Sequence, residues 1–173
     1  MTDTAGRETE AAPVEHVVAM LRERLYGAIS CLATLVVLSR YTAEEGTAWI
    51  LMVDVAVTMG GLWAASLLAD FVAHLAVHEQ APSRADRWRV LQASGQILQA
   101  AVLPLAALAF AGIGVLDTAT AMWVAMWILV GELGLIALLA VRRTRLPWWQ
   151  QIATIAALIV IGLLVIAVKV LTH

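Results

Sequence analysis

The stretch Trp49 to Glu79 constrains this chain more than any other feature, because it is almost wholly apolar. At a rise of ~1.5 Å per residue, a helix of this length extends about 46 Å, whereas the hydrocarbon core of a bilayer is about 30 Å thick. We therefore predict that the stretch crosses a membrane as a helix. Its end near Glu79 is expected to project into the water on the cytoplasmic side.

Four further apolar runs are long enough to cross a membrane: residues 25–41, 88–114, 119–141 and 152–171. The chain is 62% apolar and 14% charged, whereas soluble proteins are roughly 45–50% apolar and about 25% charged. We predict an all-α integral membrane protein, a bundle of five transmembrane helices within residues 16–173. Residues 1–15 are polar and are expected to form a disordered tail, followed by an amphipathic helix that leads into the first span.

The distribution of arginine and lysine predicts the orientation of these helices, because cytoplasmic loops retain the basic residues. With a cytoplasmic amino terminus, nine arginines fall inside: Arg7, Arg22, Arg24, Arg84, Arg87, Arg89, Arg142, Arg143 and Arg145. Only Arg40 and Lys169 fall outside. We therefore expect the carboxyl terminus outside and a bacterial inner membrane as the location. Trp49, Trp88, Trp148 and Trp149 lie at the expected membrane boundaries, where tryptophan anchors helices.

The long second stretch carries four polar residues, Asp54, Asp70, His74 and His78. The last three are spaced by four, so they share one narrow stripe of a helix. A carboxylate with two imidazoles suits manganese, iron(II), cobalt or zinc. A proton relay and a pair of interfacial histidines remain alternatives. Asp54 lies about 24 Å from Asp70 along a helix axis, so it belongs to another site, either an exit group or a cap.

Three more polar residues lie within the other spans: Glu132, Gln96 and Ser30. A carboxyl group at bilayer depth costs about 3 kcal/mol on insertion scales and marks an ion or proton path, unless it is protonated and hydrogen-bonded within the bundle. Glutamine and serine can line such a path or bond neighbouring helices. We predict that these three residues line an ion or proton route, with helix-to-helix hydrogen bonding as the alternative.

The sequence also argues against other classes of function. It contains no phosphate-binding loop and no nucleophile elbow, so we do not expect an enzyme. The basic residues gather at one membrane face, which leaves no nucleic-acid surface. Cys31 is the single cysteine and provides no disulfide or cysteine metal site.

Three short motifs resemble those of the vacuolar iron transporter family, which includes the yeast-type calcium-sensitive cross-complementer transporters. Arg24 to Ala28 is similar to the family's Arg-x-x-Tyr-Gly, Leu67 to His74 to its Leu-x-Ala-Asp-Gly-x-Ser-Met, and Val102 to Leu105 to its proline-bearing third helix. The chain departs from the family at Ile29 to Cys31, where the family has Asn-Asp-Gly, and at His74, where it has methionine.

The resemblance implies a homodimer that moves iron(II) or manganese out of the cytoplasm, in exchange for protons. Asp70 is the site residue that the resemblance carries over, and His74 and His78 would help it capture the ion. An alternative is a membrane interaction protein that transports nothing. Its arginine-rich inner face would bind a partner protein or anionic lipid.

Overall fold

The computed structural model describes residues 3–39, 47–78, 81–142 and 147–171. Helices make up almost all of this part of the chain, and no strand occurs in it. The helices are α1 (Asp3–Leu38), α2 (Ala48–His78), α3 (Arg84–Gly112), α4 (Thr118–Arg142) and α5 (Trp148–Leu171). The predicted all-helical class is confirmed.

The ends of the helices follow local sequence signals. Ser83 precedes α3 and forms a capping box, in which its hydroxyl accepts from the Asp86 backbone N–H and the Asp86 carboxylate accepts from the Ser83 N–H. Gly114 ends the same helix with a φ of 80°, a left-handed conformation that glycine adopts without steric cost. Pro104 lies inside α3, which continues through it.

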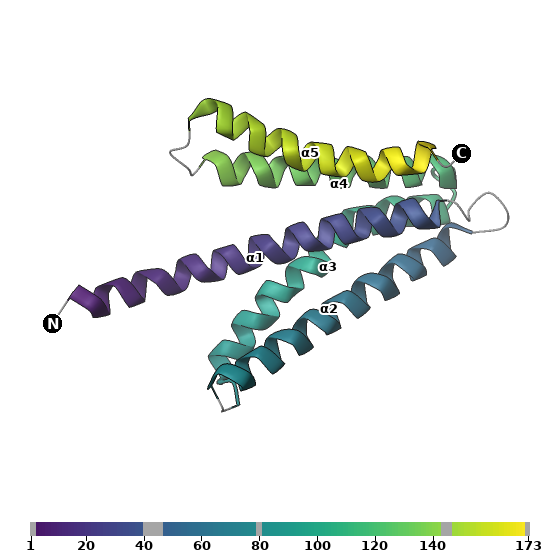
Figure 1. Ribbon diagram of the computed structural model, residues 1–173. Helices are drawn as coiled ribbons and strands as arrows, with labels where there is room; N and C mark the ends of the chain where they lie inside the picture. Colours follow the sequence, from purple (N-terminus) through teal and green to yellow (C-terminus); the bar gives the residue numbers. More distant parts are fainter. Residues whose placement is uncertain (1–2, 40–46, 79–80, 143–146, 172–173) are drawn as a thin grey trace.

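The helices converge at one end of the molecule and separate at the other (Figure 1). α3 packs against α1, α2 and α4, and α5 packs mainly on α4. We call the end with the α2–α3 connection the open end. There α2 and α3 diverge from α4 and α5, and α1 runs between the two pairs (Figure 1).

The apolar core lies on the facing sides of α1 to α4. Leu32 and Leu35 of α1 are fully buried, as are Ile97 of α3 and Leu129 of α4. Burial of one such side chain contributes about 1.5–3 kcal/mol in water, but inside a bilayer close packing rather than water exclusion holds helices together. We call the end opposite the open end the closed end, and most residues of this core lie in the halves of the helices nearer to it.

Three helices are long and apolar enough to cross a membrane, among the residues that the structure describes: α2 over Ala48–Val77, α3 over Arg84–Gly112 and α4 over Thr118–Leu139. Many apolar side chains point outward on these helices, which suits contact with lipid. A membrane protein is therefore supported, with three candidate spans.

The observed bounds lie close to the predicted runs, with one large difference. α2 begins and ends one residue before the predicted 49–79. α1 begins at Asp3, so the segment expected as a tail is helical and continuous with the first apolar run. Alanine and glutamate, each of which occurs three times in this segment, are strong helix formers, and an existing helix extends without a new nucleation step.

Candidate functional site

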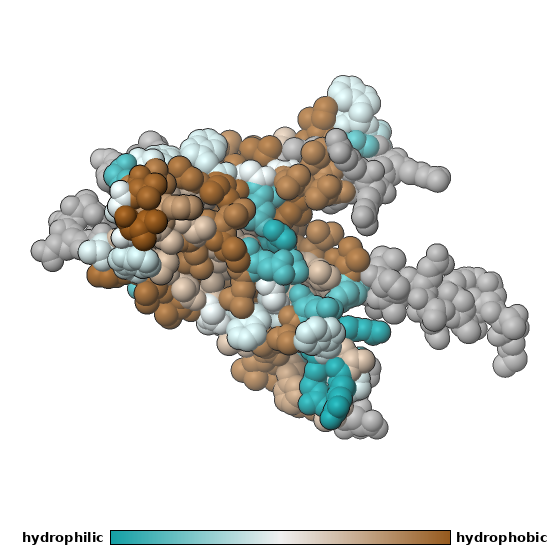
Figure 2. Space-filling view, turned by 180° about the vertical axis from the view of Figure 1, so that it is seen from behind, coloured by the Kyte–Doolittle hydropathy of each residue, from teal (hydrophilic) through white to brown (hydrophobic). Residues whose placement is uncertain are grey.

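Hydrophilic side chains form a band across an otherwise largely apolar face (Figure 2). Three consecutive charged residues, Arg22, Glu23 and Arg24, lie on α1. Successive residues of a helix point about 100° apart, because a turn contains 3.6 residues. The three charged side chains can therefore reach different neighbouring helices.

Arg24 connects α1 to α3 and α4. Its Nε donates a hydrogen bond of 2.6 Å to Oε1 of Glu132, and its Nη1 donates one of 3.4 Å to Oε1 of Gln96. The Glu132 side chain is 9% exposed and that of Arg24 is 35% exposed. The arginine thus supplies the countercharge that a carboxylate needs inside an apolar bundle.

Glu23 connects α1 to α2. Ser66 donates a hydrogen bond of 3.0 Å to Oε2 of Glu23, while Arg22 donates to Oε1 at 2.9 and 3.2 Å. Glu23 is buried, whereas the Arg22 side chain is 68% exposed. Both oxygens of this buried carboxylate therefore have partners, as buried charges require.

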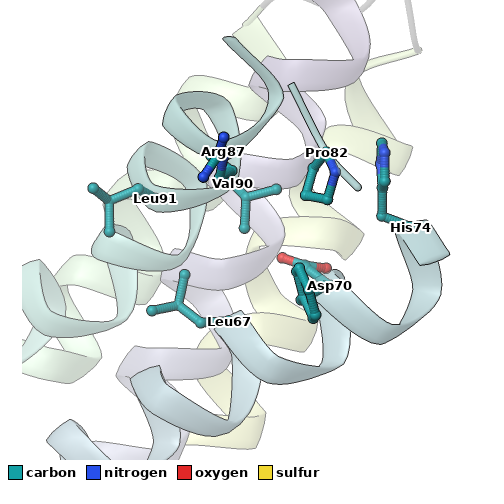
Figure 3. A pocket seen from close by; sticks show the side chains of 8 residues that line it. Leu67, Asp70, His74, Pro82, Arg87, Val90 and Leu91 are labelled. Atoms are coloured by element: carbon teal, nitrogen blue, oxygen red, sulfur yellow. The ribbon is translucent and has the colours of Figure 1, made fainter. Parts of the chain in front are cut away.

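Asp70 and His74, one turn apart on α2, line a cavity of about 270 Å³ between α2 and α3. Leu67 and Phe71 form the rest of its α2 wall. In Figure 3 the Asp70 carboxylate lies between α2 and α3, with Arg87 on the α3 side. Asp70 and His74, two of the three residues of the predicted stripe, therefore face a cavity.

Asp70 lines two further cavities. One of about 440 Å³ lies between α1 and α2 and includes Arg22, Glu23 and Ser66. The other, of about 370 Å³, lies among α1, α2 and α3 and includes His74 with Arg22 and the α1 residue His16. Asp70 is thus placed where three cavities meet.

The other predicted site residues do not join this cluster. Asp54 is exposed near the start of α2, where its backbone carbonyl accepts from Thr58, and it lines none of these three cavities. Ser30 is half-buried in α1, and its backbone carbonyl accepts from Thr34. Gln96 and Glu132 meet at Arg24 rather than at Asp70.

The predicted trio for a metal ion stays a prediction. The side chain of His78 lies outside the described residues. Among the side chains that the structure describes, no three of His, Cys, Asp or Glu lie close enough together to hold a metal ion. Asp70 and His74 would therefore need water, His78 or another molecule to complete a coordination shell.

The four predicted tryptophan anchors have exposed side chains. Trp88, Trp148 and Trp149 lie near the open end, at the first turns of α3 and α5. Trp49 lies at the start of α2, and its indole contacts Gly112 at the end of α3. Exposed indoles at helix ends suit membrane boundaries.

Glu23, Arg22 and Arg24 are not among the site residues that the sequence predicts, because they fall in the amphipathic helix expected to lead into the first span. One signal was available. A carboxyl group in the middle of a span, such as Glu132, needs a cation or a proton, and Arg24 begins the motif that enters the first span.

Comparisons with models of protein families, with curated proteins and with solved structures found no match.

Proposed function

We propose that this protein transports a divalent transition metal, iron(II) or manganese, out of the cytoplasm. The observation that carries the proposal is the position of Asp70, which lines three cavities, with His74 beside it in two of them. A carboxylate and an imidazole that face open cavities are ligands that manganese and iron(II) accept. The motif resemblance around Asp70 points to the same residue and the same cargo.

The cavity between α1 and α2 suggests the next step of the route. Glu23 lies in it beside Ser66, and Arg22 neutralises the Glu23 carboxylate. An ion that leaves Asp70 would replace the exposed Arg22 guanidinium as the countercharge of Glu23. Exchange against protons is part of the proposal, because carboxylates and histidine can carry protons back.

The deciding experiment is flux of manganese and iron(II) into proteoliposomes that contain the purified protein. Asp70→Asn and His74→Ala are each expected to reduce flux by roughly tenfold or more, since loss of a ligand or its supporting group commonly has an effect of this size. Asp117→Asn is the matched control, because Asp117 is an exposed carboxylate outside the three cavities. Unchanged flux in the Asp70→Asn, His74→Ala double variant would rule out the proposed site.

The proposal includes a five-span topology in a bacterial inner membrane, with the amino terminus in the cytoplasm, and a homodimer. The excess of arginine on one side supports the orientation, and the resemblance supports the dimer. Reporter fusions at both termini test the orientation. Light scattering of the detergent-purified protein tests the subunit count.

A further inference from the structure

The cavity between α2 and α3 has apolar walls and an arginine, Arg87, that have no role in the transport proposal. Its walls are mainly apolar and come from both helices, with Leu67 and Phe71 on α2 and Val90 and Leu91 on α3 (Figure 3). Arg87 stands on the α3 side, in the first turn of that helix. The cavity thus combines an apolar space with one guanidinium.

The arginines at the start of α3 carry more positive charge than their one acidic neighbour, Asp86, offsets, although Arg89 interacts electrostatically with it. Arg84, Arg87 and Arg89 are exposed, and no ion pair or side-chain hydrogen bond involves them within the described part of the chain. Asp86 lies among them, but its carboxylate accepts from the hydroxyl and the N–H of Ser83. The four charged residues therefore leave an excess of positive charge that an external anion can neutralise.

Asp70 is the acidic group that faces this cavity. Arg22 of α1 is near Asp70, since both residues line the two neighbouring cavities, but it does not line this one. Asp70 also stands on α2, while Arg87 is on α3, so the two charges belong to opposite walls (Figure 3). An anion at Arg87 is thus held on the wall away from the carboxylate.

The position of the cavity indicates the kind of anion. α2 and α3 are both candidate membrane spans, and the cavity lies beside the connection between them, where apolar helices meet the headgroup layer. Trp88, next to Arg87, is 60% exposed, as expected for an indole at this depth. A small water-soluble anion would gain no favourable contact from the apolar walls, whereas an anion with an acyl chain would.

We propose that this cavity binds one anionic phospholipid, with the phosphate against Arg87 and an acyl chain along Leu67, Phe71 and Leu91. A phosphate accepts charge-assisted hydrogen bonds from a guanidinium. An acyl chain has no polar groups to satisfy and can pack against the apolar walls. This lipid site does not depend on metal transport. Arg87 and the three apolar residues have no part in the ion site proposed at Asp70 and His74.

Native mass spectrometry of the detergent-purified protein tests the proposal, with EDTA present to remove divalent ions. Phosphatidylglycerol is expected to be retained in preference to phosphatidylcholine of the same chains. Arg87→Ala should weaken retention of phosphatidylglycerol by roughly tenfold, the value of one strong charge-assisted contact. Arg84→Ala removes the same charge from the same helical turn but not from the cavity lining, and it should have an effect below about twofold.

Leu91→Trp is the second variant, since Leu91 is 40% exposed and a larger side chain there fills the cavity with little disturbance of the core. It should reduce retention of phosphatidylglycerol while all arginines stay in place. Equal losses in Arg84→Ala and Arg87→Ala would contradict the site, because they would indicate diffuse surface charge. Equal retention of both lipids by the unmodified protein, or full retention in Leu91→Trp, would also contradict it.

Discussion

Nε of Arg24 in α1 lies 2.6 Å from Oε1 of Glu132 in α4, although 108 residues separate them along the chain. The same guanidinium donates to Gln96 of α3, so one side chain bonds to two other helices. Arg24 and its two partners each adjoin a residue of the apolar core along the chain, Leu25, Ile97 and Leu133, so this charged contact lies beside apolar packing.

The Arg24–Glu132 pair predicts a clear difference between single and double variants. Arg24→Met should lower the free energy of unfolding by about 3 kcal/mol, because a buried carboxylate is left without its cation. Arg24→Met with Glu132→Leu should recover most of this loss, since neither charge remains. Unfolding by SDS in mixed micelles measures both values. Losses that simply add in the double variant would show that the pair is not coupled.

The contact between Ser66 and Glu23 gives a second prediction. Ser66→Ala removes a hydrogen bond to a buried carboxylate, and it should destabilise the protein by about 1.5 kcal/mol. Thr58→Ala is the control, because Thr58 is exposed and bonds only to the backbone of its own helix; its effect should stay within about 0.5 kcal/mol. The same SDS titration measures both variants, and equal effects would argue against the role of Ser66.

The crossing of α1 and α3 depends on a glycine. A Cβ at Gly27 would lie 2.8 Å from Cα of Ile97, so Gly27→Ala must push the two backbones apart. Overpacking of this kind costs about 1–3 kcal/mol. Gly95→Ala, on α3, meets nothing within 4 Å and should be neutral or stabilising by up to about 1 kcal/mol. Thermal unfolding in detergent compares the two, and a Gly27→Ala protein as stable as Gly95→Ala would contradict the close crossing.

The Asp117 carboxylate is expected to make a pH-dependent contribution to the stability of the folded protein. Hydrogen bonds from Thr120, including its backbone N–H at 2.9 Å, lower the pKa of the Asp117 carboxyl below its ordinary value. A lowered pKa in the folded state means that the stabilisation is present above the unfolded value of about 3.9 and disappears as the pH falls through the folded value. Asp117→Ala should therefore lower the melting temperature at pH 7, where the cap is ionised.

Near pH 3 the difference in melting temperature between the unmodified protein and Asp117→Ala should shrink. A protonated Asp117 carboxyl is a poorer hydrogen-bond acceptor for the N–H groups at the start of α4. Melting temperatures of the unmodified protein and the variant, measured in parallel from pH 7 down to pH 3, give the difference directly. Asp54→Ala serves as the control, since its side chain has no capping contact in the described structure. A difference that stays constant over this pH range would exclude the titration of Asp117 as its cause.

The sequence by itself determined the helices, because long apolar runs and their polar interruptions act locally. The stretch from Trp49 to Glu79 became α2 within one residue at each end, and Ser83 and Asp86 formed the cap that their spacing allows. The sequence also predicts that Asp70 and His74 share one face of α2, since residues four apart do so in any tertiary arrangement.

Only the tertiary structure decided which polar groups meet. The sequence places the Glu132 carboxylate within a span, but its pairing with Arg24 depends on the crossing of α1 with α4. Glu23 belongs to the segment expected to form an amphipathic helix, and the fold buries it opposite Ser66 of α2. Helix formation is governed by neighbours along the chain, whereas the pairing of buried charges is governed by the angles and registers at which separate helices pack.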